Sequence, residues 1–74
     1  MITLAGAPLG VPLTIADTGV TGPAGKRLAM MGVRPGALVT VMLRTSGGGR
    51  VLDVAGARLA VGRDLLARLS VEEA

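Results

Sequence analysis

The sequence predicts a small, mostly β domain: a partly closed barrel of five short strands with one short helix between the first and second strands. Three features predict this class: short runs with alternating apolar side chains, tight-turn residues between them, and one stretch with helical spacing. A chain of 74 residues makes one small domain, so we expect residues 1–74 to fold as a unit. Partial closure would also limit the exposed sheet edges of so small a protein.

The stretch with helical spacing begins at Ala24. Ala24, Leu28 and Met31 follow one another at intervals of four and three residues, so they share one face of a helix. Lys26 and Arg27 lie away from that face. We therefore expect a one-sided helix that is sealed against the barrel by Leu28 and Met31.

A glycine and a proline predict how this helix ends. Gly32 suits the position just after the last helical residue, because glycine readily adopts the left-handed conformation that ends many helices. Val33 would then pack back on Leu28. Residues 34–37 read Arg-Pro-Gly-Ala, which fits a type II turn because proline presets one central torsion and glycine accepts the positive φ of the other.

Alternation predicts the strands. From Leu38 to Arg44, side chains Val39, Val41 and Leu43 point to one side of the chain, and the residues between them point to the other. The same argument applies to the other runs, although they are shorter. The five expected strands are Leu13–Asp17, Leu38–Arg44, Arg50–Val54, Ala57–Val61 and Arg68–Val71.

Short connections join these strands. Thr45–Gly49 is expected to be a hairpin loop, and Ala55–Gly56 a tight turn between the next two strands. Gly62–Ala67 is too short for an independent helix, so it should form about one helical turn. Glu72–Ala74 is expected to be a solvated tail.

Composition excludes most site chemistry. The chain has no cysteine and no histidine, which excludes disulfides, thiolate metal sites and the commonest general acid-base residue. Ser46 and Ser70 therefore lack an activating histidine, so we expect a protein that is not an enzyme. We see no signal peptide and no apolar run long enough to span a bilayer, so we expect a soluble, cytoplasmic protein.

No cofactor or metal motif is matched by the sequence. Residues 19–26 resemble a phosphate-binding loop, but that motif needs glycine at Val20 and a hydroxyl residue at Arg27. Methionines more often fill core gaps or contact surfaces than bind a soft metal. We therefore expect no cofactor and no protein-only metal site, since the carboxylates are dispersed along the chain: Asp17, Asp53, Asp64, Glu72 and Glu73.

The net charge of +3 permits an acidic partner, a membrane surface or nucleic acid. Aromatic residues, on which small barrels stack single-stranded bases, are absent from the sequence. We therefore expect no nucleic-acid partner, although contacts to the backbone of a duplex stay open as an alternative.

Two motifs together resemble a known family. Residues 27–36, Arg-Leu-Ala-Met-Met-Gly-Val-Arg-Pro-Gly, are similar to the Arg-Leu-x-x-Met/Leu-Gly-x-x-Pro-Gly signature of the FeoA family. Residues 48–61 resemble that family's Gly-Gly-Pro hairpin, with Arg50 where proline is common, and Leu9-Gly10 loosely resembles its first segment. The resemblance covers nearly the whole chain.

The resemblance implies an SH3-like barrel that acts in the cytoplasm as an accessory protein of ferrous iron uptake. Its implied partner is the FeoB transporter, a membrane protein with a cytosolic GTPase domain, whose assembly or activity it would modulate. A similar domain occurs at the carboxyl end of iron-dependent repressors, so a regulatory or nucleic-acid-binding module is the alternative. Direct binding of ferrous iron, a transition metal ion, is the least favoured function.

We expect the partner surface on the polar side of the helix and at its exit, because arginine and methionine together are typical of protein interfaces. The alternative is that these side chains only solvate the helix. A weak homo-oligomer is also open. The expected partner-binding residues are Lys26, Arg27, Met30 and Arg34.

Overall fold

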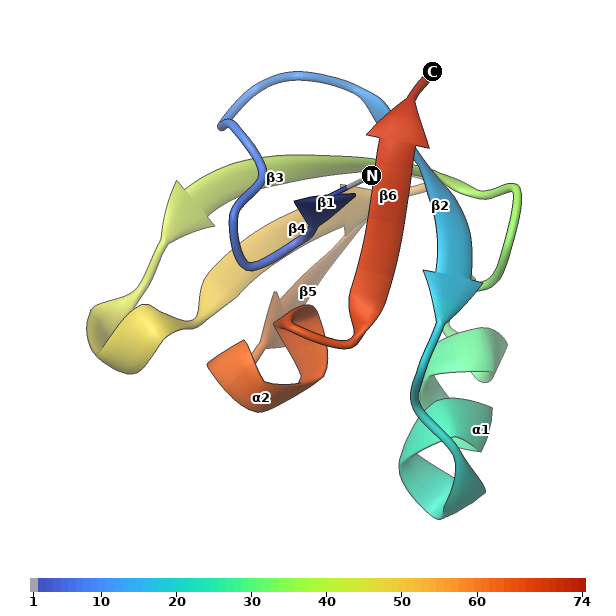
Figure 1. The fold of residues 1–74 in the computed structure, drawn as a ribbon. Helices are drawn as coiled ribbons and strands as arrows, with labels where there is room; N and C mark the ends of the chain where they lie inside the picture. The colour runs from blue at the N-terminus through green and yellow to red at the C-terminus, as the bar shows by residue number, and fades with distance from the viewer. Residues whose placement is uncertain (1) are drawn as a thin grey trace.

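A computed structural model describes residues 2–74 and shows a single antiparallel sheet of six strands, in the order β1-β6-β2-β3-β4-β5 (Figure 1). The sheet curves around the core. Its two edge strands, β1 and β5, do not pair with each other within the described residues, so the sheet is not closed. The strands are β1 (Ile2–Thr3), β2 (Leu13–Thr18), β3 (Leu38–Arg44), β4 (Arg50–Val54), β5 (Ala57–Val61) and β6 (Leu69–Glu73). Two helices, α1 (Gly22–Met30) and α2 (Arg63–Leu66), and a 3-10 turn, η1 (Ser46–Gly48), complete the fold.

The predicted fold class, mostly β with one short helix between the first two predicted strands, is confirmed, with six strands instead of five. The additional strand is β1, in which Ile2 pairs with Val71 of β6. The expectation of a solvated tail is wrong in part, because Glu72 and Glu73 extend β6 by pairing with β2. A two-residue strand and an acidic strand end lack the apolar alternation from which the other strands were predicted.

Helix α1 ends as predicted. Gly32 has φ +95°, and its N–H donates to the Ala29 carbonyl over 3.1 Å, while the Val33 N–H donates to the Leu28 carbonyl over 2.9 Å. These two bonds form the Schellman arrangement that satisfies the last helical carbonyls. Val33 and Leu28 are both buried in the core, as expected.

The turn after the helix returns the chain to the sheet. The Ala37 N–H donates to the Arg34 carbonyl over 3.0 Å, and Gly36 has φ +90°, as a type II turn requires. The Gly36 N–H then donates to the Ile15 carbonyl over 2.8 Å. This bond ties the exit of α1 to the middle of β2.

The alternation expected along β3 fails at its end. Val39 and Val41 are buried, but Leu43 is 46% exposed. The ladder shifts by one residue between Val41 and Leu43, which leaves Met42 as a β-bulge. One extra residue moves the following side chains to the opposite face, so Leu43 now lies opposite Val51 on the outer side.

The two hairpins form where they were predicted. Thr45–Gly49 closes the first hairpin, with the Thr45 N–H donating to the Gly49 carbonyl over 2.9 Å. Ala55 and Gly56 form the two-residue turn of the second, with φ values of +53° and +84°. Two positive φ values are typical of a type I′ turn, which matches the twist of the flanking strands. The Asp53 carboxylate accepts the Gly56 N–H over 3.1 Å and braces this turn.

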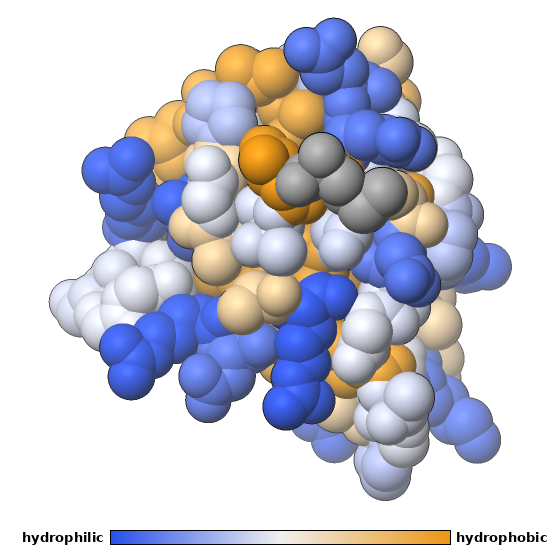
Figure 2. Space-filling view, in the orientation of Figure 1, coloured by the Kyte–Doolittle hydropathy of each residue, from blue (hydrophilic) through white to orange (hydrophobic). Residues whose placement is uncertain are grey.

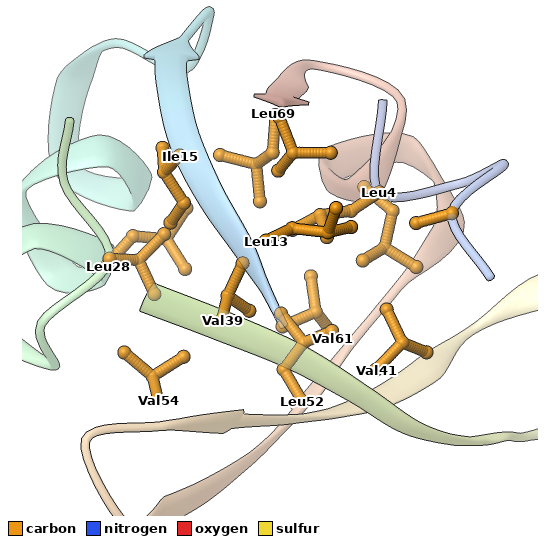
Figure 3. Close-up of a cluster of buried hydrophobic side chains, with 14 of the residues drawn as sticks. Leu4, Leu13, Ile15, Leu28, Val39, Val41, Leu52, Val54, Val61 and Leu69 are labelled. Atoms are coloured by element: carbon orange, nitrogen blue, oxygen red, sulfur yellow. The ribbon is translucent and has the colours of Figure 1, made fainter. Parts of the chain in front are cut away.

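The core consists of aliphatic side chains from the strands, the first segment and α1, as Figure 3 shows for a cluster that includes Leu4, Ile15 and Leu28. Leu52 of β4 and Leu66 of α2 are fully buried in the same core. The expectation that Met31 seals the helix is wrong, because Met31 is 40% exposed. It occupies the C-cap of α1, where the backbone has left the helical path.

Arg50 is the buried charged residue of this core, with 8% of its surface exposed. Its Nη1 group donates to the carbonyl oxygen of Ala7, which is also buried. Arg50 therefore ties the segment between β1 and β2 to β4. This contact joins residues far apart in the sequence, so alternation alone could not predict it.

Candidate binding groove between α1 and β5

A groove of about 340 Å³ lies between helix α1 and edge strand β5, and we call it the α1–β5 groove. Its helix wall consists of Ala24, Leu28 and Met31. The opposite wall is formed by the end of β5 and the start of α2, namely Leu59, Ala60, Val61 and Leu65. Its volume lies at the low end of the range for ligand sites, and its walls are mainly aliphatic.

The charged residues that line this groove are both cationic. Arg27 contributes from α1 and Arg58 from β5, and no carboxylate is among its lining residues. Asp53 lies opposite Arg58 in the β4–β5 ladder, and its carboxylate, which also accepts the Gly56 N–H, offsets part of the charge of Arg58. The groove therefore combines apolar walls with two arginines, of which Arg27 has no carboxylate among the other lining residues.

The four partner-binding residues predicted from the sequence all lie on the surface of α1 or just after it. Lys26, Arg27 and Arg34 are exposed, and Met30 is 80% exposed, which is the highest value among the exposed large hydrophobic residues. Of the four, Arg27 is brought to the groove and the other three do not line it. They remain a predicted surface beside it.

Sequence reasoning missed the β5 side of the groove. Arg58, Leu59 and Ala60 could be assigned to a strand, but their proximity to α1 depends on the tertiary fold. Met31 is the C-cap residue of α1, so its side chain is half exposed and lines the groove. No sequence signal indicates this placement, because the helical spacing of Met31 predicts a buried side chain.

Two further surface features lie away from the groove. A second hollow of about 330 Å³ beside β1 and β6 carries carboxylates, those of Glu72 and Glu73. Figure 2 shows hydrophobic residues gathered at the upper left, over the loop before β2 and over β3. Exposed apolar residues of these segments are Leu9, Val11, Met42 and Leu43.

The carboxylates of the described residues are dispersed. Within residues 2–74, no three or more histidine, cysteine, aspartate or glutamate residues lie close enough together to hold a metal ion. None of the helices in this range is long and apolar enough to cross a membrane.

Comparison with known proteins identifies the family. The sequence profile of the FeoA domain matches residues 2–73. The chain belongs to the FeoA domain family. No curated protein sequence matches this FeoA domain significantly.

Solved structures give the same result for the fold. Iron(II) transport protein A from Clostridium thermocellum superposes with a TM-score of 0.89 at 22% identity, over 97% of this chain and 45% of that chain. An iron uptake regulatory protein (FeoA) superposes at 0.83 with 27% identity, over 96% of this chain and 93% of the other. FeoA of Stenotrophomonas maltophilia with zinc, described as a procaryotic SH3 domain protein, superposes with a TM-score of 0.82 at 21% identity, over 97% of this chain and 91% of that chain. This FeoA domain therefore has the predicted SH3-like fold, and it spans less than half of the first of these proteins.

The likeness extends to a metal-dependent regulator. The manganese regulator SloR superposes with a TM-score of 0.82 at 14% identity, over 99% of this chain and 34% of that protein. At this identity the likeness concerns the fold alone. The expectation of a similar domain in iron-dependent repressors is thus met in part, because SloR is a larger metal regulator but its metal is manganese.

Proposed function

We propose that this FeoA domain is a cytoplasmic, non-enzymatic accessory protein of ferrous iron uptake. It binds the cytosolic GTPase part of a FeoB-type transporter and modulates the assembly or activity of that transporter. The observation that carries the proposal is membership of the FeoA family over residues 2–73. The proteins of known structure named for iron(II) transport and iron uptake support the same process.

The surface that carries the interaction is the exposed side of α1 together with the α1–β5 groove. Lys26, Arg27 and Arg34 give it a positive charge, and Met30 adds an exposed, adaptable apolar side chain. Arginine and methionine are enriched at protein interfaces, whereas lysine is depleted there. Arg27 is therefore the residue on which we concentrate the test, because it belongs both to the helix surface and to the groove.

The test is a calorimetric titration of the chain against the purified GTPase domain of a FeoB-type transporter. Arg27→Glu should weaken binding at least about tenfold, because reversing one charge at a complementary interface costs more than about 1.4 kcal/mol. Arg44→Glu is the matched control: Arg44 is an exposed arginine at the end of β3, which does not line the groove. Both side chains are exposed, so Arg44→Glu should leave the melting temperature unchanged, whereas Arg27→Glu should lower it slightly because it places a negative charge in the last turn of α1.

The outcomes separate function from surface. If the parent chain does not bind the GTPase domain, the proposed function is refuted. If it binds and both variants bind equally well, the function stands and the assigned surface is wrong. The regulator alternative predicts binding to duplex DNA that weakens steeply between low and moderate salt, which the same titration with DNA would detect.

A further inference from the structure

The two edges of the sheet differ in length. At one edge, β1 contains only two residues, Ile2 and Thr3. At the other edge, β5 contains five, Ala57–Val61, and its strand partner among the described residues is β4 alone. A long edge strand presents unpaired backbone groups, which proteins usually blunt or cover. Here the α1–β5 groove lies directly beside that edge.

The register of the second hairpin shows which backbone groups are unpaired. Val54 and Ala57 flank a two-residue turn, so they form a hydrogen-bonded pair, and such pairs alternate along an antiparallel ladder. Leu59 and Val61 therefore bond to β4, whereas the N–H and C=O groups of Arg58 and Ala60 point away from it. The turn and loop hydrogen bonds of residues 2–74 include none to these groups.

The side chains around this edge define what could pair with it. Leu59 shares the inner face of β5 with Val61 and lines the groove opposite Leu28 and Met31 of α1. A strand added beside β5 would direct every second side chain into this apolar space. Its intervening side chains would share the face of Arg58, where a carboxylate is the complementary group.

We propose that the α1–β5 groove binds an extended, acidic segment of the partner, which adds a seventh strand to the sheet at the free edge of β5. The segment alternates apolar residues, which enter the groove, with acidic residues, which face Arg58 and Arg27. Its main chain bonds to the free groups of Arg58 and Ala60, as in other cases of strand addition. This inference rests on the proposed function, because the segment belongs to the GTPase partner.

Amide hydrogen exchange tests strand addition directly. The chain is labelled with ¹⁵N, and exchange is followed alone and with the transporter's GTPase domain. The Arg58 and Ala60 amides should exchange rapidly in the free chain and at least about tenfold more slowly in the complex, because they gain main-chain acceptors. The Leu59 amide, already bonded within the ladder, serves as the internal reference.

A pair of variants at one position provides a second test. Ala60→Pro removes the outward N–H and blocks strand addition, while the ladder to β4 is kept because proline is tolerated on a sheet edge. It should weaken binding at least about tenfold, whereas Ala60→Ser, which keeps the N–H and changes only the side chain, should weaken it much less. Circular dichroism checks that both variants fold, and if Ala60→Pro does not, the exchange measurement on the parent chain still decides.

Each result has a defined meaning. A complex in which the Arg58 and Ala60 amides exchange as before overturns strand addition and leaves the proposed function standing. The absence of any complex overturns both. Slower exchange that appears on concentrating the chain alone shows that a second copy occupies the groove, which overturns the assignment to the partner.

Discussion

Replacing Gly32 by alanine should destabilise the domain, because this residue carries the left-handed conformation that ends α1. Its φ of +95° lies where an L-amino acid is strained. A Cβ built at this position would come 3.4 Å from Cγ1 of Val54, which is ordinary van der Waals contact. Steric overlap is therefore a minor term, and the cost arises from the backbone conformation.

The magnitude follows from two opposing terms. Left-handed backbone costs a residue with a Cβ roughly 1 to 2 kcal/mol. In the opposite direction, alanine has less conformational freedom than glycine in the unfolded chain, which stabilises the folded state by about 0.4 to 1 kcal/mol. We therefore expect Gly32→Ala to lower the free energy of unfolding by about 1 kcal/mol, and Gly32→Val by that amount or more because its side chain is branched at Cβ.

Thermal unfolding measures this cost. A loss of about 1 kcal/mol should lower the melting temperature of a domain of this size by roughly 4 to 8 °C. The control is Gly6→Ala, which makes the same chemical change at a residue without positive φ and with no heavy atom within 4 Å of the new Cβ. Equal melting temperatures for Gly32→Ala and Gly6→Ala would refute the cap, and unchanged exchange of the Val33 amide would confirm that refutation.

Two further substitutions test other local features. Ala55 has φ +53° in the type I′ turn, so Ala55→Asn should raise the free energy of unfolding by about 0.5 to 1 kcal/mol, because asparagine tolerates this conformation better. Urea unfolding checks this, and a lower midpoint would contradict the turn assignment. Arg50→Met should cost about 1 to 3 kcal/mol, because it leaves the buried Ala7 carbonyl without a donor. The same titration measures it, and a variant as stable as the parent would show that this hydrogen bond contributes nothing net.

The features predicted well from the sequence are those fixed by local chemistry. Gly32 and the Arg34–Ala37 turn could be placed because glycine and proline restrict the backbone whatever surrounds them. The Ala55–Gly56 turn could be placed because alternating strands flank it on both sides. These segments need no knowledge of the tertiary fold.

The features that were missed depend on contacts between distant segments. β1 is a strand only because β6 lies beside it, and the bulge at Met42 reverses the side of Leu43 through its pairing with β4. Half of the groove was missed for the same reason, since α1 and β5 meet only in the folded chain. The candidate site was therefore predicted on the helix, through Arg27, and not on the strand.

The position of β6 between β1 and β2 affects how the domain can come apart. The strands β3, β4 and β5 follow one another through short loops, so the entropy of closing their hairpins is small. The ladder between β2 and β6, in contrast, closes a loop that contains α1 and all three of those strands. Although that loop is long, β2 pairs five residues with β6 and only two with β3. Subglobal opening should therefore begin between β2 and β3 and leave the β3–β4–β5 meander paired, so that the β5 edge persists after the sheet has divided.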